Sequence, residues 1–280
     1  MTSLDTLPLL DANRAAPQDA VASVAERGHC VVRALASTEE LAPYRDPIER
    51  AIRLHAANTP SLQERDTYGR AFLQVGNLHE FTADDHDRAI IKRFVFAQRF
   101  ARVAAELLGV PAVRLYHDQA LAKEPGGGFT PWHQDQVYWP LATDRTITMW
   151  MPLVDVPIDV GSMTFADGTH REGDLGEWVI GDESEAEFER VVNQRGFHTT
   201  THGAMRAGDA TFHLGWTLHR APANGTDLFR SVMTVIYFAD GTRVGPIDSP
   251  YRKFDAAVWL SGAAEGALAN SPRNPMLWPT

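Results

Sequence analysis

The sequence predicts a mainly β protein, a sandwich or a barrel, with flanking helices. Helical patterns, in which apolar residues recur every three or four positions, stop near Pro111. Beyond Pro111, short apolar or alternating runs follow one another, separated by Gly, Pro, Asn and Asp, as in sandwiches and barrels. A hydrophobic content of 44% over 280 residues is enough for a substantial core.

The first expected elements are a helix and a strand. Residues 17–27 form an amphipathic pattern that Gly28 ends, and residues 29–33 are typical of a strand. Ser37 followed three positions later by Glu40 has the form of a capping box, which marks the start of the next helix.

That second helix should reach Ala57, with Pro43 and Pro47 breaking or kinking its start. Residues 58–86 lack periodicity and are expected to be irregular, with binding loops or a lid. Residues 87–108 carry the clearest apolar stripe and predict one long helix.

The β region is interrupted once and followed by a tail. The acidic run at 181–189 predicts a surface helix with a solvated face. The tail from 243 to 280 is expected to pack over the sheets and to bury Tyr251, Trp259 and Trp278. The expected strands are 112–122, 129–138, 146–154, 160–166, 197–202, 210–214 and 230–238.

Composition excludes several classes of protein. A net charge of −10 without a Lys/Arg cluster disfavours nucleic-acid binding. Cys30 is the only cysteine, so no intramolecular disulfide can form, which fits a reducing cytoplasm. The first residues lack a basic segment followed by an apolar run, and no stretch approaches the roughly 18 apolar residues of a membrane helix. We therefore expect a cytoplasmic protein with no membrane partner.

The chemistry is expected at residues 130–139, where His133 and Asp135 stand two positions apart. On a strand, such residues point to the same face, so the imidazole and the carboxylate would enter one cavity. His219 is the best candidate for a third ligand. Two histidines and a carboxylate leave three positions of an octahedron open, which suits non-haem Fe(II).

The His-x-Asp motif alone does not identify a metal site. With 11 His and 36 Asp and Glu, the composition gives about one His-x-Asp/Glu by chance. A second match is His170-Arg-Glu172. The residues after His219 support the metal-site interpretation, because Arg230 begins the following strand. If the two strands pair as a hairpin, Arg230 lies near the metal end of the sheet, and its planar fork fits a carboxylate.

These pieces together resemble the phytanoyl-CoA dioxygenase family of Fe(II)/2-oxoglutarate oxygenases. The matching segments, in order, are Trp132-His-Gln-Asp135, Thr146-Ile-Thr-Met-Trp150, Gly161-Ser-Met-Thr-Phe165, Asp167-Gly-Thr-His170, and His219 with Arg230 eleven residues on. The resemblance implies a double-stranded β-helix, the cupin-like jelly roll. It implies Fe(II), 2-oxoglutarate as co-substrate, and dioxygen.

The resemblance also assigns site residues. It places the metal ligands on His133, Asp135 and His219, the contact to the distal carboxylate of 2-oxoglutarate on Arg230, and a co-substrate wall on Trp150. It makes His170 a turn residue and no ligand. Because Asp135 keeps the carboxylate that some related halogenases lack, we expect hydroxylation or another oxidation.

Further pocket residues follow from strand faces and from proximity. Thr148 shares a face with Trp150, and Gln119 lies on the preceding strand; both are assigned to the co-substrate. Around the metal motif, the expected substrate contacts are Gln136, Tyr138 and Trp139. Other expectations are an exposed Lys123, core positions for Trp132 and Trp216, His79 on a lid, Phe81 and Tyr68 on a pocket wall, and ordinary hydrogen-bonded or surface roles for His117, His198, His202 and His213.

The expected layout is one oxygenase domain over residues 1–280. Residues 1–111 form a mostly helical buttress that offers a lid, 112–240 the jelly-roll core, and 241–280 a C-terminal packing segment. Without a basic patch for a CoA nucleotide, the substrate is expected to be another small molecule, in the manner of natural-product tailoring. Two alternatives stay open: a zinc hydrolase with the same three ligands, and a non-catalytic jelly-roll binding protein.

Overall fold

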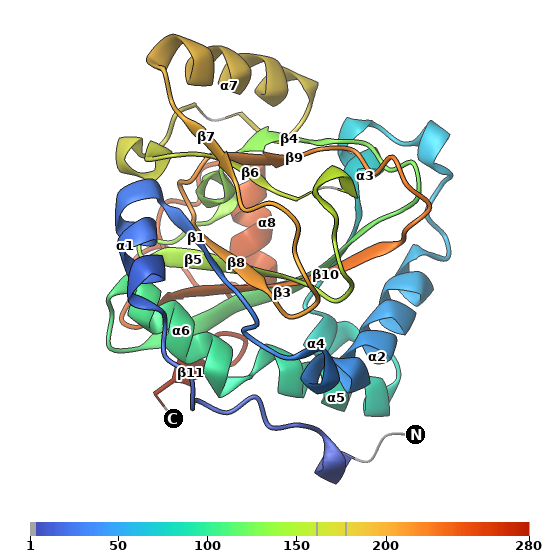
Figure 1. Cartoon of the computed structure of the whole chain (residues 1–280). Coiled ribbons are helices and arrows are strands. Elements are labelled where there is room, and N and C mark those ends of the chain that lie inside the picture. Colours follow the sequence, from blue (N-terminus) through green and yellow to red (C-terminus); the bar gives the residue numbers. More distant parts are fainter. Residues whose placement is uncertain (1–3, 161, 177, 280) are drawn as a thin grey trace.

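The computed structural model describes residues 4–160, 162–176 and 178–279, and it consists of two antiparallel sheets that face each other (Figure 1). The larger sheet has the order β1-β8-β5-β10-β3-β11, with β2 also paired to β3. The smaller has the order β4-β9-β6-β7. This is the predicted jelly roll.

The strands of the larger sheet are β1 His29–Val32, β2 Leu73–Gly76, β3 Val113–Lys123, β5 Thr146–Pro152, β8 Ala210–Leu214, β10 Arg230–Ala239 and β11 Met276–Trp278. Those of the smaller sheet are β4 Thr130–His133, β6 Thr164–Ala166, β7 Thr199–Thr201 and β9 His219–Ala221.

Helices cover the outer faces of both sheets. Most pack below the larger sheet, and α7 lies outside the smaller one (Figure 1). The α-helices are α1 Gln18–Arg27, α2 Thr38–Ala56, α3 Thr67–Ala71, α4 Leu78–Phe81, α5 Asp85–Val95, α6 Gln98–Leu108, α7 Asp182–Arg195 and α8 Pro250–Val258. Short 3₁₀ turns are η1 Leu4–Thr6, η2 Leu62–Glu64, η3 Asp135–Tyr138, η4 Ile158–Val160 and η5 Thr169–Glu172. No helix in the described part of the chain is long and apolar enough to cross a membrane.

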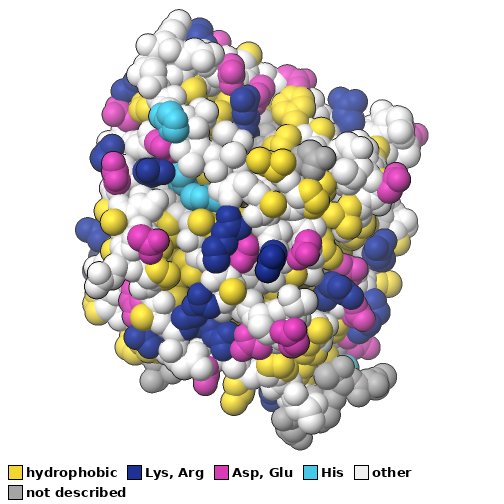
Figure 2. All heavy atoms as spheres, viewed as in Figure 1, with side chains coloured by type: hydrophobic (Ala, Val, Ile, Leu, Met, Phe, Trp, Pro, Cys, Tyr) yellow, Lys and Arg dark blue, Asp and Glu magenta, His cyan; other side chains and the backbone are white. Residues whose placement is uncertain are grey.

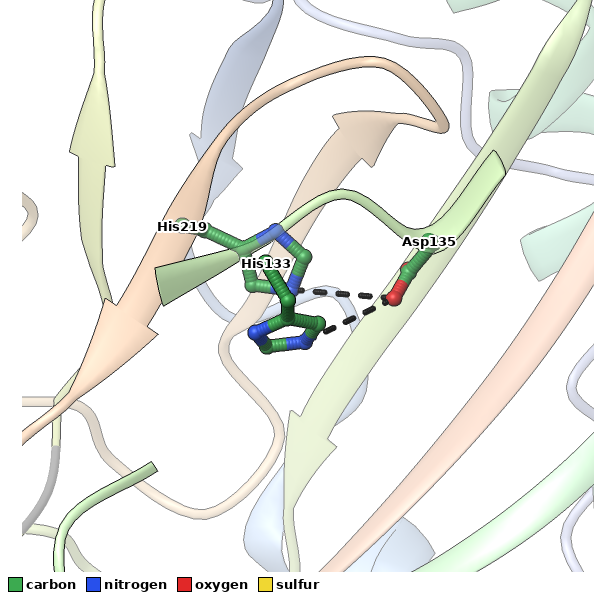
Figure 3. A group of neighbouring side chains, drawn as sticks. All are labelled: His133, Asp135 and His219. Atoms are coloured by element: carbon green, nitrogen blue, oxygen red, sulfur yellow. Dashed lines mark ion pairs between the residues drawn. The ribbon is translucent and has the colours of Figure 1, made fainter. Parts of the chain in front are cut away.

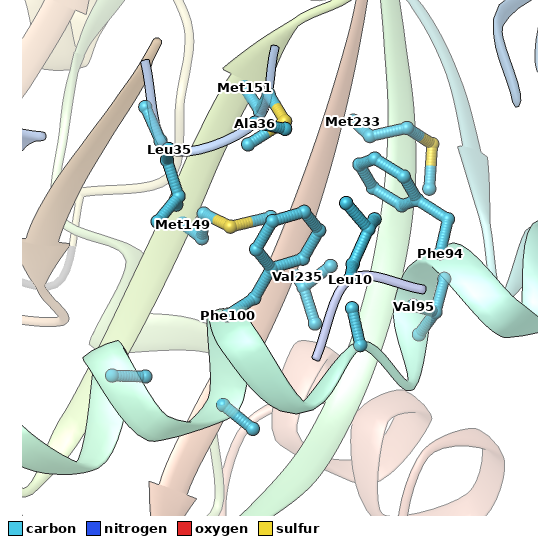
Figure 4. Packing of buried hydrophobic residues seen from close by; sticks show 14 of the residues in the cluster. Leu10, Leu35, Ala36, Phe94, Val95, Phe100, Met149, Met151, Met233 and Val235 are labelled. Carbon is cyan, nitrogen blue, oxygen red and sulfur yellow. The ribbon is translucent and has the colours of Figure 1, made fainter. Parts of the chain in front are cut away.

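The main apolar core lies between the larger sheet and the helices, outside the barrel. Met149 of β5 lies beside Phe100 of α6, and Met233 of β10 lies beside Phe94 of α5 (Figure 4). Truncating a buried phenylalanine such as Phe100 to alanine typically costs about 3–5 kcal/mol. Because this face alone supplies a continuous core, the opposite face of the sheet can carry polar side chains.

Local signals at the helix ends are correct. Ser37 and Glu40 form the predicted capping box at the start of α2. Gly28 and Gly109 end α1 and α6 with positive φ angles of 87° and 64°, a conformation that glycine adopts without steric cost.

Two expected helix boundaries are wrong. Helix α2 is not broken at Pro43 or Pro47, because its packed apolar face outweighs the lost backbone hydrogen bonds. The single helix expected over 87–108 is two helices, α5 and α6, and the chain turns at Phe96 and Ala97 between them.

Other elements differ from expectation because tertiary contacts decide them. Residues 58–86 contain β2, which pairs with β3. Tyr251 is 44% exposed instead of buried. The strand expected over 129–138 ends at His133, and Asp135 begins η3. Gly161, part of one family-like segment, lies outside the described residues.

The surface mixes charges of both signs. On the face shown in Figure 2, Lys and Arg side chains are interspersed with Asp and Glu. Elsewhere in the described chain, exposed charged side chains form pairs such as Arg88 with Asp85 and Arg190 with Glu187. Exposed pairs of this kind contribute little to stability, about 0–1 kcal/mol each.

Candidate metal centre and cavity

Two neighbouring strands of the smaller sheet, with the turn after one of them, bring three side chains to one point. His133 ends β4, His219 begins β9, and the two residues are direct partners in the antiparallel pairing of these strands. Asp135 lies in the turn that follows β4. One ligand atom from each of the three lies within 4.8 Å of the others, a spacing that fits a metal ion (Figure 3).

The outer nitrogens of both histidines are occupied by backbone carbonyls. Nδ1 of His133 lies 2.8 Å from the carbonyl oxygen of Pro131, and Nδ1 of His219 lies 2.9 Å from that of Thr217. A carbonyl only accepts, so each Nδ1 carries the proton and each Nε2 keeps its lone pair. Both Nε2 atoms face Oδ1 of Asp135, at 3.6 and 3.9 Å.

The carboxylate of Asp135 is oriented from behind. Its Oδ2 accepts a hydrogen bond from Oγ1 of Thr148 at 3.1 Å and lies 3.2 Å from Nε2 of His213. These contacts leave Oδ1 directed at the two histidines, so the carboxylate offers one oxygen to a metal. Supporting contacts of this kind fix ligands in place.

The environment favours ligands without protons. Burial lowers the pKa of His219 well below its ordinary value, and burial also lowers that of His133. Burial alone would raise the pKa of Asp135, but the neighbouring His219, His213 and His133 hold it below its ordinary value. Metals bind neutral imidazole and ionised carboxylate, so this protonation state suits a metal.

A cavity of about 680 Å³ opens over the three residues. Arg230 lines it, is 2% exposed, and has its guanidinium carbon 5.3 Å from the ring centre of Trp150. Burial lowers the pKa of Arg230 to about 9, so an anion beside it would be stabilising. The cavity can therefore hold both a metal and an organic acid.

Comparison with known proteins shows which family this chain belongs to. The family model described as phytanoyl-CoA dioxygenase (PhyH) matches residues 24–232, about three quarters of the sequence. The chain belongs to the PhyH family. PhyH proteins are oxidoreductases that use Fe(II) and 2-oxoglutarate, and this chain is an enzyme of that class.

Solved structures extend the comparison. The epimerase SnoN from nogalamycin biosynthesis, in complex with Fe³⁺, α-ketoglutarate and nogalamycin RO, is 27% identical; the match covers 93% of this chain and 98% of that one with a TM-score of 0.73. The α-ketoglutarate-dependent carbocyclase SnoK from the same biosynthesis is 21% identical, over 93% and 96%, with a TM-score of 0.73. EctD from S. alaskensis, with 2-oxoglutarate and 5-hydroxyectoine, is 18% identical, over 87% and 88%, with a TM-score of 0.63. The last two likenesses show the PhyH-like fold alone.

In this PhyH chain, most predicted site residues lie together. Trp150, Thr148 and Gln119 line the cavity from the inner face of the larger sheet, and Tyr138 and Trp139 line it from the end of η3. The alternation of β5 predicts this correctly, since Met149 and Met151 lie on the other face.

Two predictions about neighbouring side chains are wrong. Gln136 does not reach the cavity, because its side chain bonds to Thr146 and to the carbonyl of Thr143. Lys123 is fully buried and donates to the carbonyl of Gly128 and to Oγ1 of Thr130, at 2.5 and 3.1 Å. Burial and the nearby Arg230 lower the pKa of Lys123 to about 6.

The acidic helix α7 has a structural role that the sequence reading missed. Glu185 accepts from the backbone N–H of Trp132 at 2.7 Å, and Glu189 accepts from the indole of Trp132 at 2.8 Å. Arg220 pairs with both glutamates, at 2.8 and 2.9 Å. The helix thus clamps β4 and β9 directly behind His133.

The other histidines separate into distinct roles. His213 contacts Asp135, although the sequence predicted only an ordinary hydrogen-bonded or surface role for it. The signal in the sequence is its position on β8, two residues from Thr211 and therefore on the same face of the strand. His117 lines the cavity. His79 is buried against Asp118 and is not on a lid. His170 lies in the turn η5, apart from the candidate ligands.

The structure also shows which of the aromatic residues singled out in the sequence lie in the core and which line the cavity. Trp132 is in the core as expected, whereas Trp216 is only partly buried and bonds to Asp144. Tyr68 lines the cavity. Phe81 is 43% exposed, stacks with Arg273, and is not part of the cavity wall.

Proposed function

We propose that this PhyH enzyme oxidises a C–H bond of a small molecule, and that His133, Asp135 and His219 bind its Fe(II). The observation that carries the proposal is the convergence of three proton-free ligand atoms under a cavity that also contains a buried arginine. Three protein ligands leave room for a co-substrate and dioxygen. When bound, Fe(II), 2-oxoglutarate and dioxygen supply an oxidant that can remove hydrogen from a C–H bond while 2-oxoglutarate is converted to succinate.

The chain's own residues have three tasks in this proposal. Arg230 pairs with the distal carboxylate of 2-oxoglutarate, and Trp150 forms a wall beside it. Thr148 and His213 hold Asp135 so that one oxygen faces the metal. The aromatic walls of the cavity orient the substrate and exclude water.

The proposal also concerns the reaction outcome and the class of substrate. SnoN is described as an epimerase and SnoK as a carbocyclase, although both share this fold. The fold therefore permits several outcomes, and the position of the substrate above the metal selects among them. Because both of those proteins act in nogalamycin biosynthesis, we propose a natural-product substrate for this chain.

Succinate release tests the proposal. The purified protein is loaded with Fe(II) without oxygen, mixed with 2-oxoglutarate, and exposed to air, with and without the metal. We expect succinate only when iron, 2-oxoglutarate and air are all present. Hydrolytic activity with zinc alone would support a zinc hydrolase, and binding of 2-oxoglutarate without any succinate would support a non-catalytic protein.

A further inference from the structure

The cavity has two ends, and the register of the larger sheet orders them. On β10, the residues Arg230, Thr234 and Ile236 all line the cavity. The backbones of Arg230 and Ile236 are six residues apart, about 20 Å along a strand, but the guanidinium of Arg230 lies 5.3 Å from the ring of Trp150, two residues from Thr148 on β5. Ile236 is the partner of Thr148, which bonds to Asp135. The candidate metal centre therefore lies near Ile236, and Arg230 defines one end, the co-substrate end.

Helix α8 defines the opposite end. His117 on β3 is the other partner of Ile236, and its ring lies 4.8 Å from that of Trp259, just after α8. Tyr116 donates its hydroxyl to Asp255 of α8 at 2.8 Å. We call the part of the cavity lined by Tyr251, Phe254, Asp255 and Trp259 the α8 end.

The α8 end is aromatic and large. Tyr251 and Phe254 line the cavity and are 44% and 57% exposed, and Tyr68 and Phe72 of the α3 region also line it. Aromatic side chains that gather in one cavity, unlike single exposed ones, mark a binding surface. 2-Oxoglutarate is a five-carbon diacid and occupies a small part of 680 Å³, so the rest has the size of a substrate with several rings.

The α8 end contains one carboxyl group, that of Asp255, and it accepts hydrogen bonds from neutral donors. Asp255 is 7% exposed, and Tyr116 and the side chain of Trp259 bond to its carboxyl group. Within the described part of the chain, no Lys, Arg or His forms an ion pair with Asp255. Of the two arginines that line the cavity, Arg220 is paired with Glu185 and Glu189, and Arg230 lies at the other end.

We propose that the substrate of this enzyme is a multi-ring aromatic molecule that carries a basic amine, and that Asp255 binds the ammonium group. The inference rests on the proposed function for the position of the metal. A buried carboxylate with neutral donors on one side and a cavity on the other is stabilised by a cation from the cavity. The same carboxylate repels acids, so a carboxylated or phosphorylated substrate is excluded from the α8 end.

A matched series of probes tests the inference. We use 9-(aminomethyl)anthracene, 9-(hydroxymethyl)anthracene and 9-anthracenecarboxylate, which share one ring system and differ in charge. Fluorescence titration is done without oxygen on the protein loaded with Fe(II) and 2-oxoglutarate. We expect the amine to bind about tenfold more tightly than the alcohol, as a charge-assisted hydrogen bond allows, and the carboxylate to bind most weakly.

Variants assign the preference to one residue. Asp255→Asn should reduce the preference for the amine over the alcohol to about onefold. Asp248→Asn removes an exposed carboxylate just before α8 that does not line the cavity, and it should keep the tenfold preference. The charge-transfer absorption of bound Fe(II) and 2-oxoglutarate confirms that each variant keeps its co-substrate site.

Three results would overturn the inference: equal binding of amine and alcohol by the unchanged protein, tighter binding of the carboxylate, or an amine preference that survives in Asp255→Asn. The first two results are measured on the unchanged protein, so they test the inference even if Asp255→Asn does not fold. If the unchanged protein releases no succinate, the proposed function fails. If it releases succinate but does not prefer the amine, only the substrate class fails.

Discussion

Two groups of histidine and aspartate side chains invite comparison, and among the residues that the structure describes only the first has the spacing of a metal site. In the first, His133, His219 and Asp135 direct three lone pairs at one point. In the second, His29 contacts His202 through Nδ1 and Asp167 through Nε2, at 3.0 and 2.9 Å. The other oxygen of Asp167 contacts Thr200 and His198.

The difference lies in the hydrogen bonds and not in the residue types. Backbone carbonyls occupy the outer nitrogens of His133 and His219, and this leaves their inner nitrogens available. In the second cluster, the side chains bond to one another, so both nitrogens of His29 are used. A group of ligand-type residues becomes a metal site only where other partners satisfy its outer atoms.

The largest expected effect comes from removing one histidine from each cluster. His219→Ala should lower iron binding and 2-oxoglutarate turnover by more than about 100-fold, because losing a ligand costs more than losing a supporting contact. His202→Ala should keep iron and turnover near those of the unchanged protein. Iron content by elemental analysis and succinate release measure both. Equal iron in the two variants would mean that the second cluster binds the metal, or that neither does.

The two arginines of the cavity offer a second contrast. Arg220 is neutralised by Glu185 and Glu189, whereas burial lowers the pKa of Arg230 to about 9. Arg230→Ala should raise the KM for 2-oxoglutarate about tenfold or more, since a charge-assisted bond contributes about 1.5–3 kcal/mol. Arg220→Gln should change that KM less than about twofold. The idea fails if Arg230→Ala binds 2-oxoglutarate as the unchanged protein does.

Two threonines sharpen the comparison at the level of single hydrogen bonds. Thr148 donates to Oδ2 of Asp135, and Thr200 donates to Oδ2 of Asp167, at 3.1 and 2.9 Å. Thr148→Val removes the first bond with little change in shape and should weaken iron binding about tenfold. Thr200→Val should leave iron binding unchanged. Competition with a chelator measures both affinities, and an equal loss in the two variants would deny Thr148 its specific role.

Local sequence patterns predict much of this molecule. Capping residues give the start of α2, and glycines give the ends of α1 and α6. Alternation on β5 gives the inner positions of Thr148 and Trp150. These features depend on neighbours in the chain, and the resemblance to the family then supplies the distant pairing of His133 with His219.

Features that depend on contacts between distant segments could not be predicted from local sequence patterns. The burial of Lys123 requires the loop at Gly128 to fold over it, and its composition gives no sign of that. The role of Glu185 and Glu189 requires β4 beneath α7. Gln136 sits next to the metal motif in sequence, but the 3₁₀ turn of η3 directs its side chain away from the cavity.

The smallest expected effect concerns a third buried carboxylate, Asp255. Unlike Asp135 and Asp167, it has only Tyr116 and Trp259 as side-chain hydrogen-bond partners among the described residues, and burial raises its pKa to about 7 from an ordinary 3.8. A raised pKa means that the folded state binds more protons than the unfolded state between these values. The contribution of Asp255 to the free energy of unfolding is therefore greatest at low pH and is lost as the pH rises from about 3.8 to about 7.

Asp255→Asn removes this pH-dependent penalty, so the variant should be more stable than the unchanged protein at pH 8, by on the order of 1–3 kcal/mol or a few degrees in Tm. The gain should shrink towards pH 5. Thermal melts of both proteins at the two pH values measure it, with Asp248→Asn as the exposed control. A site that binds a ligand at the expense of stability shows this behaviour. If the stability difference between Asp255→Asn and the unchanged protein is the same at both pH values, burial of an ionised carboxylate is not its source.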